Sequence, residues 1–379
     1  MPINGSQRDF FDIPDDVTYL NAAYIAPQLR ARRAAGLAAI DQADAPWNVT
    51  SDDFFAPVEH LRRLFAEVIG ADAEGVALVP SVSYGAGIAA ANLEVGPGKE
   101  VVVLDEQFPS NVYPWIAALE RAGGDIVTVA RPEHGSWTAP ALEAITQRTA
   151  VVTVPNCHWT DGSLLDLAAV GEAAREVGAA LALDASQSLG ARPFDAAVIQ
   201  PDFVYAVGYK WLLGPFGLGY LWAAPHRRDG KPLEEGWIVR AGAEDFSGLV
   251  DYQDEYAPGA RRYDVGQRST FYLLPMAVAA LEQLLAWGIA DVASSIGAVT
   301  DEVERKAVER GLYVAPSTDR ARHLIGVRAP DGLPDGLVGS LVEHGVYVSV
   351  RGDSIRISPH LYNDEADIDR LFGLLDESL

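Results

Sequence analysis

The sequence is poor in cysteine and in positive charge. Cys157 is the single cysteine among 379 residues, so no disulfide can form within the chain, which fits a reducing compartment. Lysine and arginine number 29 against 53 acidic residues, a net charge of −24. Such acidity disfavours binding to nucleic acid or to an anionic membrane surface. We therefore expect neither nucleic acid nor a membrane as a partner.

Long apolar runs and metal-binding patterns are also missing. No run is long enough to span a bilayer, and the first residues lack the charged-then-apolar pattern of a secretion signal. We expect a cytoplasmic protein. The seven histidines are scattered, and the adjacent Cys157 and His158 lack the spacing of a zinc site, so we expect no metal.

What the sequence does contain is an ordinary globular composition, 49% hydrophobic, over a length that suggests two to three domains. We predict an N-terminal arm (1–16), a large domain (17–262) and a smaller C-terminal α+β domain (263–379). Between residues 76 and 222, apolar strands alternate with amphipathic helices. This alternation predicts an α/β fold whose mostly parallel sheet is covered by helices on both faces. The predicted strands are 76–79, 101–105, 125–130, 150–154, 180–184, 203–207 and 217–222.

Helices are expected on both sides of this region. Helical spacing runs over 21–42 and over 51–69, where Gly70 ends the helix. Residues 273–310 predict one or two helices broken near Gly288. Residues 227–262 form a long charged stretch without regular periodicity, and a loop of this length in a compact domain is usually functional or packed on a partner.

Two neighbouring apolar strands end in side chains that carry chemistry. Asp184 ends one, and Lys210 follows the other. Polar groups at the carboxyl ends of neighbouring strands face the ligand crevice of an α/β sheet. A lysine amine can form a Schiff base there, and a carboxylate suits a pyridinium nitrogen. The pair predicts a pyridoxal phosphate (PLP) site. The plainer interpretations are a surface lysine and an aspartate that caps the next helix.

The stretch from Ser81 to Gly87 follows a strand and opens a helix. Its N–H groups favour an anion such as phosphate, although a simple serine cap explains it equally well. A rival interpretation is a dinucleotide fingerprint formed by Gly85, Gly87 and Ala90, with Asp105 as the ribose-binding acid. That rival predicts an NAD-dependent oxidoreductase and stays open on these residues alone.

Two further side chains are candidates. Phe108 follows a strand end, where an aromatic ring can stack on a flat cofactor, although core packing is commoner. Arg356 lies on a strand near the C-terminus, where it could clamp a substrate carboxylate or form a structural salt bridge.

Taken together, the motifs resemble the class V aminotransferase group of fold-type I PLP enzymes, which includes cysteine desulfurases, kynureninases and isopenicillin N epimerase-like proteins. The resemblance covers nearly the whole chain. The matching pieces are Phe-Pro-Ser-Asn-Val-Tyr-Pro-Trp at 108–115, Asp-Ala-Ser-Gln-Ser-Leu-Gly at 184–190 and Tyr-Lys-Trp-Leu-Leu-Gly-Pro at 209–215.

The resemblance implies a role for each matching residue. Lys210 would form the Schiff base with the cofactor and shuttle a proton at the substrate's α-carbon, and Asp184 would pair with the pyridine nitrogen. Arg356 would bind the carboxylate of an amino-acid-like substrate. It also implies a homodimer with shared active sites, in which a segment at 266–269 reaches the partner's phosphate. The remaining implied contacts are Gln187 to the ring hydroxyl, Phe108 stacked on the ring, Ser83, Tyr84 and Tyr209 at the phosphate, and Gln267 and Ser269 across the dimer.

Departures from the group narrow the reaction. Desulfurases carry a nucleophilic cysteine shortly before the arginine, whereas 349–354 has none, and they place histidine where this chain has Tyr209. Gln267 stands where the group has threonine. We favour an aminotransferase or epimerase-type activity at the α-carbon. The alternatives are a C–S or Cα–Cβ lyase and a non-catalytic member of the fold, although retention of both Lys210 and Arg356 argues against the latter.

Overall fold

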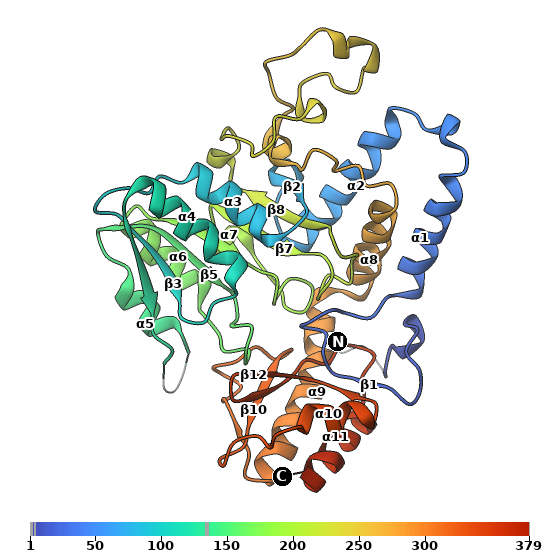
Figure 1. The fold of residues 1–379 in the computed structure, drawn as a ribbon, viewed down its shortest axis with the longest axis vertical. Coiled ribbons are helices and arrows are strands. Elements are labelled where there is room, and N and C mark those ends of the chain that lie inside the picture. The colour runs from blue at the N-terminus through green and yellow to red at the C-terminus, as the bar shows by residue number, and fades with distance from the viewer. Residues whose placement is uncertain (1–2, 4, 133–135, 379) are drawn as a thin grey trace.

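A seven-stranded sheet forms the centre of the computed structural model, which describes residues 3, 5–132 and 136–378 (Figure 1). Its order is β2-β8-β7-β6-β5-β3-β4, and β8 is antiparallel to both neighbours while the other pairs are parallel. The predicted α/β class with a mostly parallel sheet is confirmed. The strands are β2 (Val76–Val79), β3 (Glu100–Leu104), β4 (Asp125–Val129), β5 (Thr149–Pro155), β6 (Ala180–Asp184), β7 (Phe203–Val207) and β8 (Gly219–Ala223).

Helices cover both faces of this sheet because its central strands are apolar on both sides. One face packs against α3 (Val82–Asn92) and α4 (Tyr113–Ala122). The other face forms a larger core with helices from both halves of the chain. These are α2 (Asp52–Ile69), α5 (Thr138–Ala144), α6 (Leu167–Glu176) and α8 (Leu273–Trp287), while the short α7 (Ala196–Ile199) joins β6 to β7.

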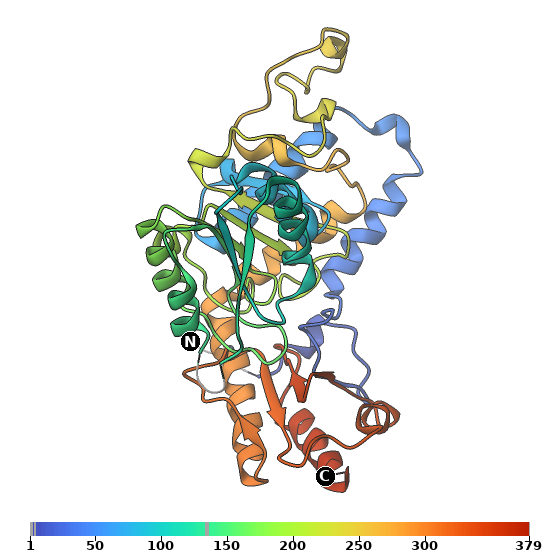
Figure 2. The ribbon, with the colours of Figure 1, turned by 60° about the vertical axis from the view of Figure 1, so that its left-hand side comes forward.

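A second, antiparallel sheet forms a separate core at one end of the molecule (Figure 2). Its order is β12-β13-β10-β9. The N-terminal strand β1 (Thr18–Tyr19) pairs with β11 (Val346–Tyr347) beside it. The predicted domain boundaries stay a prediction. The remaining elements are β9 (Tyr313–Val314), β10 (Ile325–Arg328), β12 (Ser349–Arg351), β13 (Ser354–Ile357), α10 (Leu337–Glu343) and α11 (Glu365–Ser378).

The helix α9 (Ile289–Glu309) connects the two cores. Its first half packs into the large core through Val292 and Ile296, and its second half into the small one through Val303 and Ala307. The predicted break lies at Gly288, whose φ of +79° separates α8 from α9. By length and composition, no helix in the described part of the chain could span a bilayer alone; α8 and α9 pass that test only as a pair, bent by 77°.

Two segments differ in character from the sheet cores. Residues 227–262, predicted as a long stretch without regular periodicity, contain only short 3-10 turns, and part of this loop projects from the end opposite the small sheet (Figure 1). The helix α1 (Arg30–Gln42) starts nine residues later than predicted, because Pro27 disfavours helix before it. The preceding residues instead run between the sheets, where Ala22 N donates to Ser358 O and Ala26 N to Tyr209 O.

Candidate active site

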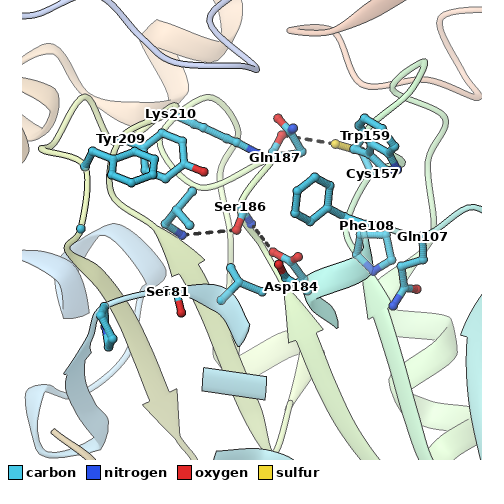
Figure 3. A pocket seen from close by; sticks show the side chains of 17 residues that line it. Ser81, Gln107, Phe108, Cys157, Trp159, Asp184, Ser186, Gln187, Tyr209 and Lys210 are labelled. Atoms are coloured by element: carbon cyan, nitrogen blue, oxygen red, sulfur yellow. Dashed lines mark hydrogen bonds between the residues drawn. The ribbon is translucent and has the colours of Figure 1, made fainter. Parts of the chain in front are cut away.

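A cavity of about 150 Å³ opens at the carboxyl ends of the central strands. Residues following β2, β3, β5, β6 and β7 line it, so it lies where an α/β sheet usually binds a ligand. Figure 3 shows Phe108, Asp184 and Lys210 facing this space from three of these strand ends. The topology therefore brings together the residues that the sequence separates by about a hundred positions.

Lys210 lies on a tight loop between β7 and β8. Gly208 N donates to Leu218 O at 3.0 Å and Gly214 N to Gly208 O at 2.8 Å, which closes the base of the loop. A Cβ on Gly208 would approach Leu218 O to 2.7 Å, so this position requires glycine. The Lys210 side chain is only 8% exposed, and its Nζ lies 5.3 Å from the centre of the Phe108 ring.

The electrostatics of Lys210 and Asp184 follow from their burial. Burial lowers the pKa of Lys210 to about 8, although the charge of Asp184 acts to raise it. Burial also raises the pKa of Asp184, against a hydrogen bond that its Oδ1 accepts from Ser186 N at 3.0 Å. Lys210 makes no ion pair within the described residues. A buried amine with a lowered pKa is partly neutral near pH 8 and can act as a nucleophile or base.

Gln187 lines the cavity and is held in place by two hydrogen bonds. Its Nε2 donates to Ala23 O at 3.1 Å, and its Oε1 accepts from Trp211 Nε1 at 3.0 Å. The amide keeps one N–H free for a ligand. Cys157 also lines the cavity, but burial raises the pKa of its thiol to about 12 and its Sγ donates to Gln187 O. A protonated thiol is a poor nucleophile, so Cys157 does not replace the cysteine that the loop lacks.

The helix that follows β2 points its N-terminus at the same cavity. Ser81 is the N-cap of α3: its Oγ accepts from Tyr84 N at 3.2 Å and lies 2.9 Å from Ser83 Oγ. Ser81 lines the cavity, whereas Ser83 is exposed and neither Ser83 nor Tyr84 lines it. Gly85 packs α3 on the sheet, because a Cβ there would come within 2.8 Å of the Cβ of Tyr205.

Two aromatic side chains border the cavity. Phe108 is 38% exposed and meets the Trp159 ring edge-on at 5.4 Å, so it is not simply packed in the core. The Tyr209 ring lies 4.5 Å from that of Phe216, and burial raises the pKa of its hydroxyl. Phe108 and Tyr209 both line the cavity together with Lys210.

Arg356 lies one residue layer away, on β13 of the small sheet. Its Nη1 donates to Trp159 O at 3.0 Å, and Trp159 lines the cavity. Arg356 is buried and pairs with no acid in the described part of the chain. Burial, with the charge of Arg351, lowers the pKa of its guanidinium to about 9. A buried cation without a counter-charge suits an anionic ligand.

Comparison with known proteins identifies the family. The model of the family described as "Aminotransferase class-V" matches residues 48–371. The chain belongs to the class-V aminotransferase family. Membership confirms the predicted PLP-dependent enzyme class and leaves the dinucleotide interpretation of Gly85, Gly87 and Asp105 without support. The residues described above fit the cofactor, since they offer a buried unpaired amine, a buried carboxylate and an aromatic ring at one cavity.

The proteins to which this chain is similar have different named activities. The uncharacterized aminotransferase YcbU of Bacillus subtilis (strain 168) is 29% identical over 82% of this chain and 80% of its own length. The isopenicillin N epimerase of Streptomyces clavuligerus is 27% identical over 83% of each chain. A variant of C-DES, a cystine C–S lyase solved with glycine covalently linked to its PLP cofactor, shares the fold with a TM-score of 0.89 and 20% identity, over 98% of this chain and 99% of that one.

Two predicted site residues lie outside the cavity of this chain. Gln267 is exposed, and Ser269 Oγ donates to Phe54 O at 2.6 Å; neither lines the cavity. Asp264, four residues upstream of Arg268, fixes this segment through a buried ion pair with Arg62. The intersubunit contact of residues 267 and 269 therefore stays a prediction.

Sequence reasoning missed several residues that line the cavity. Ser81 had a readable signal, because it comes directly after β2 where an N-cap belongs. No sequence signal marked Gln107, Trp159 or Ser186. Each follows a strand end, but whether its side chain points into the cavity depends on the conformation of its loop. Ser186 Oγ accepts from Val207 N at 3.3 Å and ties the ends of β6 and β7 together, rather than capping a helix.

Proposed function

We propose that the protein catalyses a PLP-dependent reaction at the α-carbon of an amino-acid substrate, of the aminotransferase or epimerase type. The observation that carries this proposal is Lys210: a buried amine, with its pKa lowered to about 8, at the strand end beside the buried Asp184. An amine in this state can take a proton from carbon and return it. When bound, the cofactor's pyridinium ring accepts the electron pair released at the α-carbon.

The chain's own residues would divide the remaining work. Asp184 would keep the pyridine nitrogen protonated, and Gln187 would donate its free N–H to the ring hydroxyl. Phe108 would cover one face of the ring. Arg356 would orient the substrate by its α-carboxylate through two parallel hydrogen bonds. The phosphate would lie at the N-terminus of α3, held by Ser83 and the hydroxyl of Tyr209, to which the cavity adds Ser81. The N–H of Tyr84 would join them by exchanging its bond to Ser81 Oγ for one to the phosphate.

A homodimer completes the proposal. Gln267 and Ser269 would reach the phosphate of the partner subunit. Support comes from large apolar side chains left in solvent: Tyr252 on the projecting loop is 96% exposed, and Trp47 between α1 and α2 is 80% exposed. Sedimentation of the purified protein as a single chain would contradict the homodimer.

We also propose a cytoplasmic location, supported by the single cysteine, which is free. Fractionation of the cells that make the protein tests this location.

The first experiment is the absorbance spectrum of the purified protein with PLP. We expect a band close to the visible range that borohydride removes, and we expect Lys210→Ala to abolish both the band and turnover. Lys231→Ala, which changes an exposed lysine of the projecting loop, is the matched control and should keep both. A borohydride-sensitive band that persists in Lys210→Ala would show that another amine holds the cofactor.

The second experiment separates the reactions. The holoenzyme is incubated with a panel of amino acids, and the products are identified. A keto acid indicates amino transfer, the opposite enantiomer indicates epimerisation, and loss of a β-substituent indicates the lyase alternative. Release of none of these products from any amino acid would support a non-catalytic member of the fold and contradict the proposal.

A further inference from the structure

A second hollow of about 510 Å³ adjoins the cavity of Lys210. Gln107 and Trp159 line both spaces. The outer wall of this hollow is the β12–β13 turn of the small sheet, which carries Arg351. The hollow therefore adjoins the space in which the proposed function places the substrate.

Three arginines line the hollow, and two of them are neutralised. Arg131 lies 2.9 Å from a carboxylate oxygen of Glu106 and 2.8 Å from one of Asp161. Arg328 lies 3.5 Å from an oxygen of Asp353 and 3.8 Å from one of Asp161. These pairs use all three acids that line the hollow, so its three arginines and three acids balance in charge, and what distinguishes the third arginine is that no carboxylate contacts it.

Arg351 is the third arginine, and it has no acidic partner in the described part of the chain. Its Nη1 donates to the neighbouring Val350 O at 2.8 Å, and its guanidinium carbon lies 5.6 Å from the centre of the Trp159 ring. The side chain is half-buried rather than free in solvent. A cation held over an aromatic ring keeps its outward N–H groups available for an anion.

The strand register places Arg351 on the same face as Arg356. Ser349 lies opposite Arg356 and Arg351 opposite Ser354, and side chains two residues apart on a strand share a face. Both arginines meet Trp159, Arg356 at its carbonyl oxygen and Arg351 at its ring. The positive charges of both also act to lower the pKa of Lys210, so their field reaches the cavity.

We propose that Arg351 binds a second anionic group at the far end of the substrate's side chain, so that the enzyme selects amino acids with an acidic side chain. This inference rests on the proposed function, in which Arg356 takes the α-carboxylate. Two guanidinium groups that lie on one face of the sheet, pair with no acid in the described part of the chain and both contact Trp159 match a molecule with two anionic ends. A planar guanidinium prefers carboxylate, phosphate or sulfonate to a neutral amide.

The test compares acidic amino acids with their neutral isosteres. The value of kcat/KM is measured for aspartate against asparagine and for glutamate against glutamine, in wild-type holoenzyme and in Arg351→Gln, Arg351→Lys and Arg328→Gln. We expect the wild type to prefer the acidic member. Arg351→Gln should lower kcat/KM for that member by about 10- to 100-fold while changing the neutral one less than about threefold.

Arg328→Gln is the matched control, because it removes a charge from the same hollow that is already paired. It should change the preference less than about threefold, since a paired, partly exposed arginine contributes little. Arg351→Lys should retain part of the preference for the acidic member, because lysine keeps the positive charge but lacks the planar guanidinium that forms two parallel hydrogen bonds. Equal losses in Arg328→Gln and Arg351→Gln would overturn the assignment to Arg351, as would a wild type that prefers the neutral isosteres. Cysteate and phosphoserine, run beside aspartate, show which anion the hollow takes.

Binding is measured separately from turnover. Succinate, glutarate and butyrate cannot react, so the shift of melting temperature that each produces reports binding alone. The dicarboxylates should raise the melting temperature of the wild type more than butyrate does, and Arg351→Gln should remove that difference. Equal shifts in the wild type would overturn the inference. A wild type with the cofactor band and product formation but no acidic preference would leave the proposed function standing, whereas loss of the band would contradict the proposed function itself.

Discussion

Two buried arginines, one in each half of the molecule, differ in whether an acid pairs with them. Arg62 on α2 is 0% exposed; its Nη1 donates to Asp264 Oδ1 at 3.0 Å and its Nε to Glu59 Oε1 at 2.9 Å. Arg356 on β13 is 1% exposed and donates only to neutral oxygens. The first guanidinium is neutralised within the fold, and the second is not.

The difference separates a structural charge from one available to a ligand. Burial acts to lower the pKa of Arg62, yet the carboxylate of Asp264 raises it overall. At Arg356, burial has no carboxylate to oppose it, and the pKa falls to about 9. A buried charge without a partner destabilises a fold, so a chain that retains one beside a cavity gains from it only when a ligand brings the opposite charge.

The largest effect is expected at Asp264. Asp264→Ala removes the carboxylate shared by Arg62 and Arg268, and it also removes the acceptor of Leu78 N at 2.8 Å. The buried Arg268 would then lack a counter-charge, and the buried Arg62 would keep only the partly exposed Glu59. We expect the free energy of unfolding to fall by about 3–5 kcal/mol, measured by urea denaturation. Glu74→Gln, which alters an exposed partner of Arg261, should change it by less than about 1 kcal/mol.

The opposite pattern is expected at Arg356. Arg356→Gln leaves no acid unpaired, so the free energy of unfolding should change by less than about 1 kcal/mol, whereas the transition state for turnover should lose about 2–5 kcal/mol through kcat/KM. Arg356→Lys keeps the positive charge without the planar guanidinium, so its kcat/KM should lie between those of the wild type and Arg356→Gln. A loss of stability as large as that of Asp264→Ala, with turnover unchanged, would make Arg356 structural and remove the contrast.

The central sheet was predictable because its signals are local. The strands β6 and β7 end at the residues expected, since each is a continuous apolar run followed by polar or glycine residues. Lys210 and Asp184 were found for the same reason: each follows such a run. The late start of α1 also had a local cause, Pro27, which the helical spacing of its neighbours concealed.

What the sequence concealed depends on contacts between distant segments. Residues 346–350 predict one strand, but 346–347 pair with β1 while 349–351 pair with β13, and only the second pairing places Arg351 beside Arg356. The neutralisation of Arg62 by Asp264 spans 202 residues. Nothing local distinguishes such an arginine from Arg356, so residue 356 taken alone favoured a structural salt bridge over a substrate clamp.

The smallest expected effect is a pH dependence of the unfolding free energy, which the acidic partner of Arg62 should produce and Arg356, without such a partner, should not. Burial acts to raise the pKa of Glu59, but hydrogen bonds and charges from Arg261 and Arg62 lower it from 4.5 to about 2. Because the folded pKa lies below the unfolded one, Glu59 stabilises the fold above about pH 4.5, and this contribution is lost as the pH falls towards 2. Glu59 is partly exposed, so we expect about 1 kcal/mol or less at pH 7.

The difference in unfolding free energy between the wild type and Glu59→Gln should therefore shrink from pH 7 to pH 3. The difference between the wild type and Arg356→Gln should stay constant over that range, because no carboxylate in the described part of the chain pairs with Arg356. A matching decline in both would mean that an acid also neutralises Arg356, and the two arginines would then be alike.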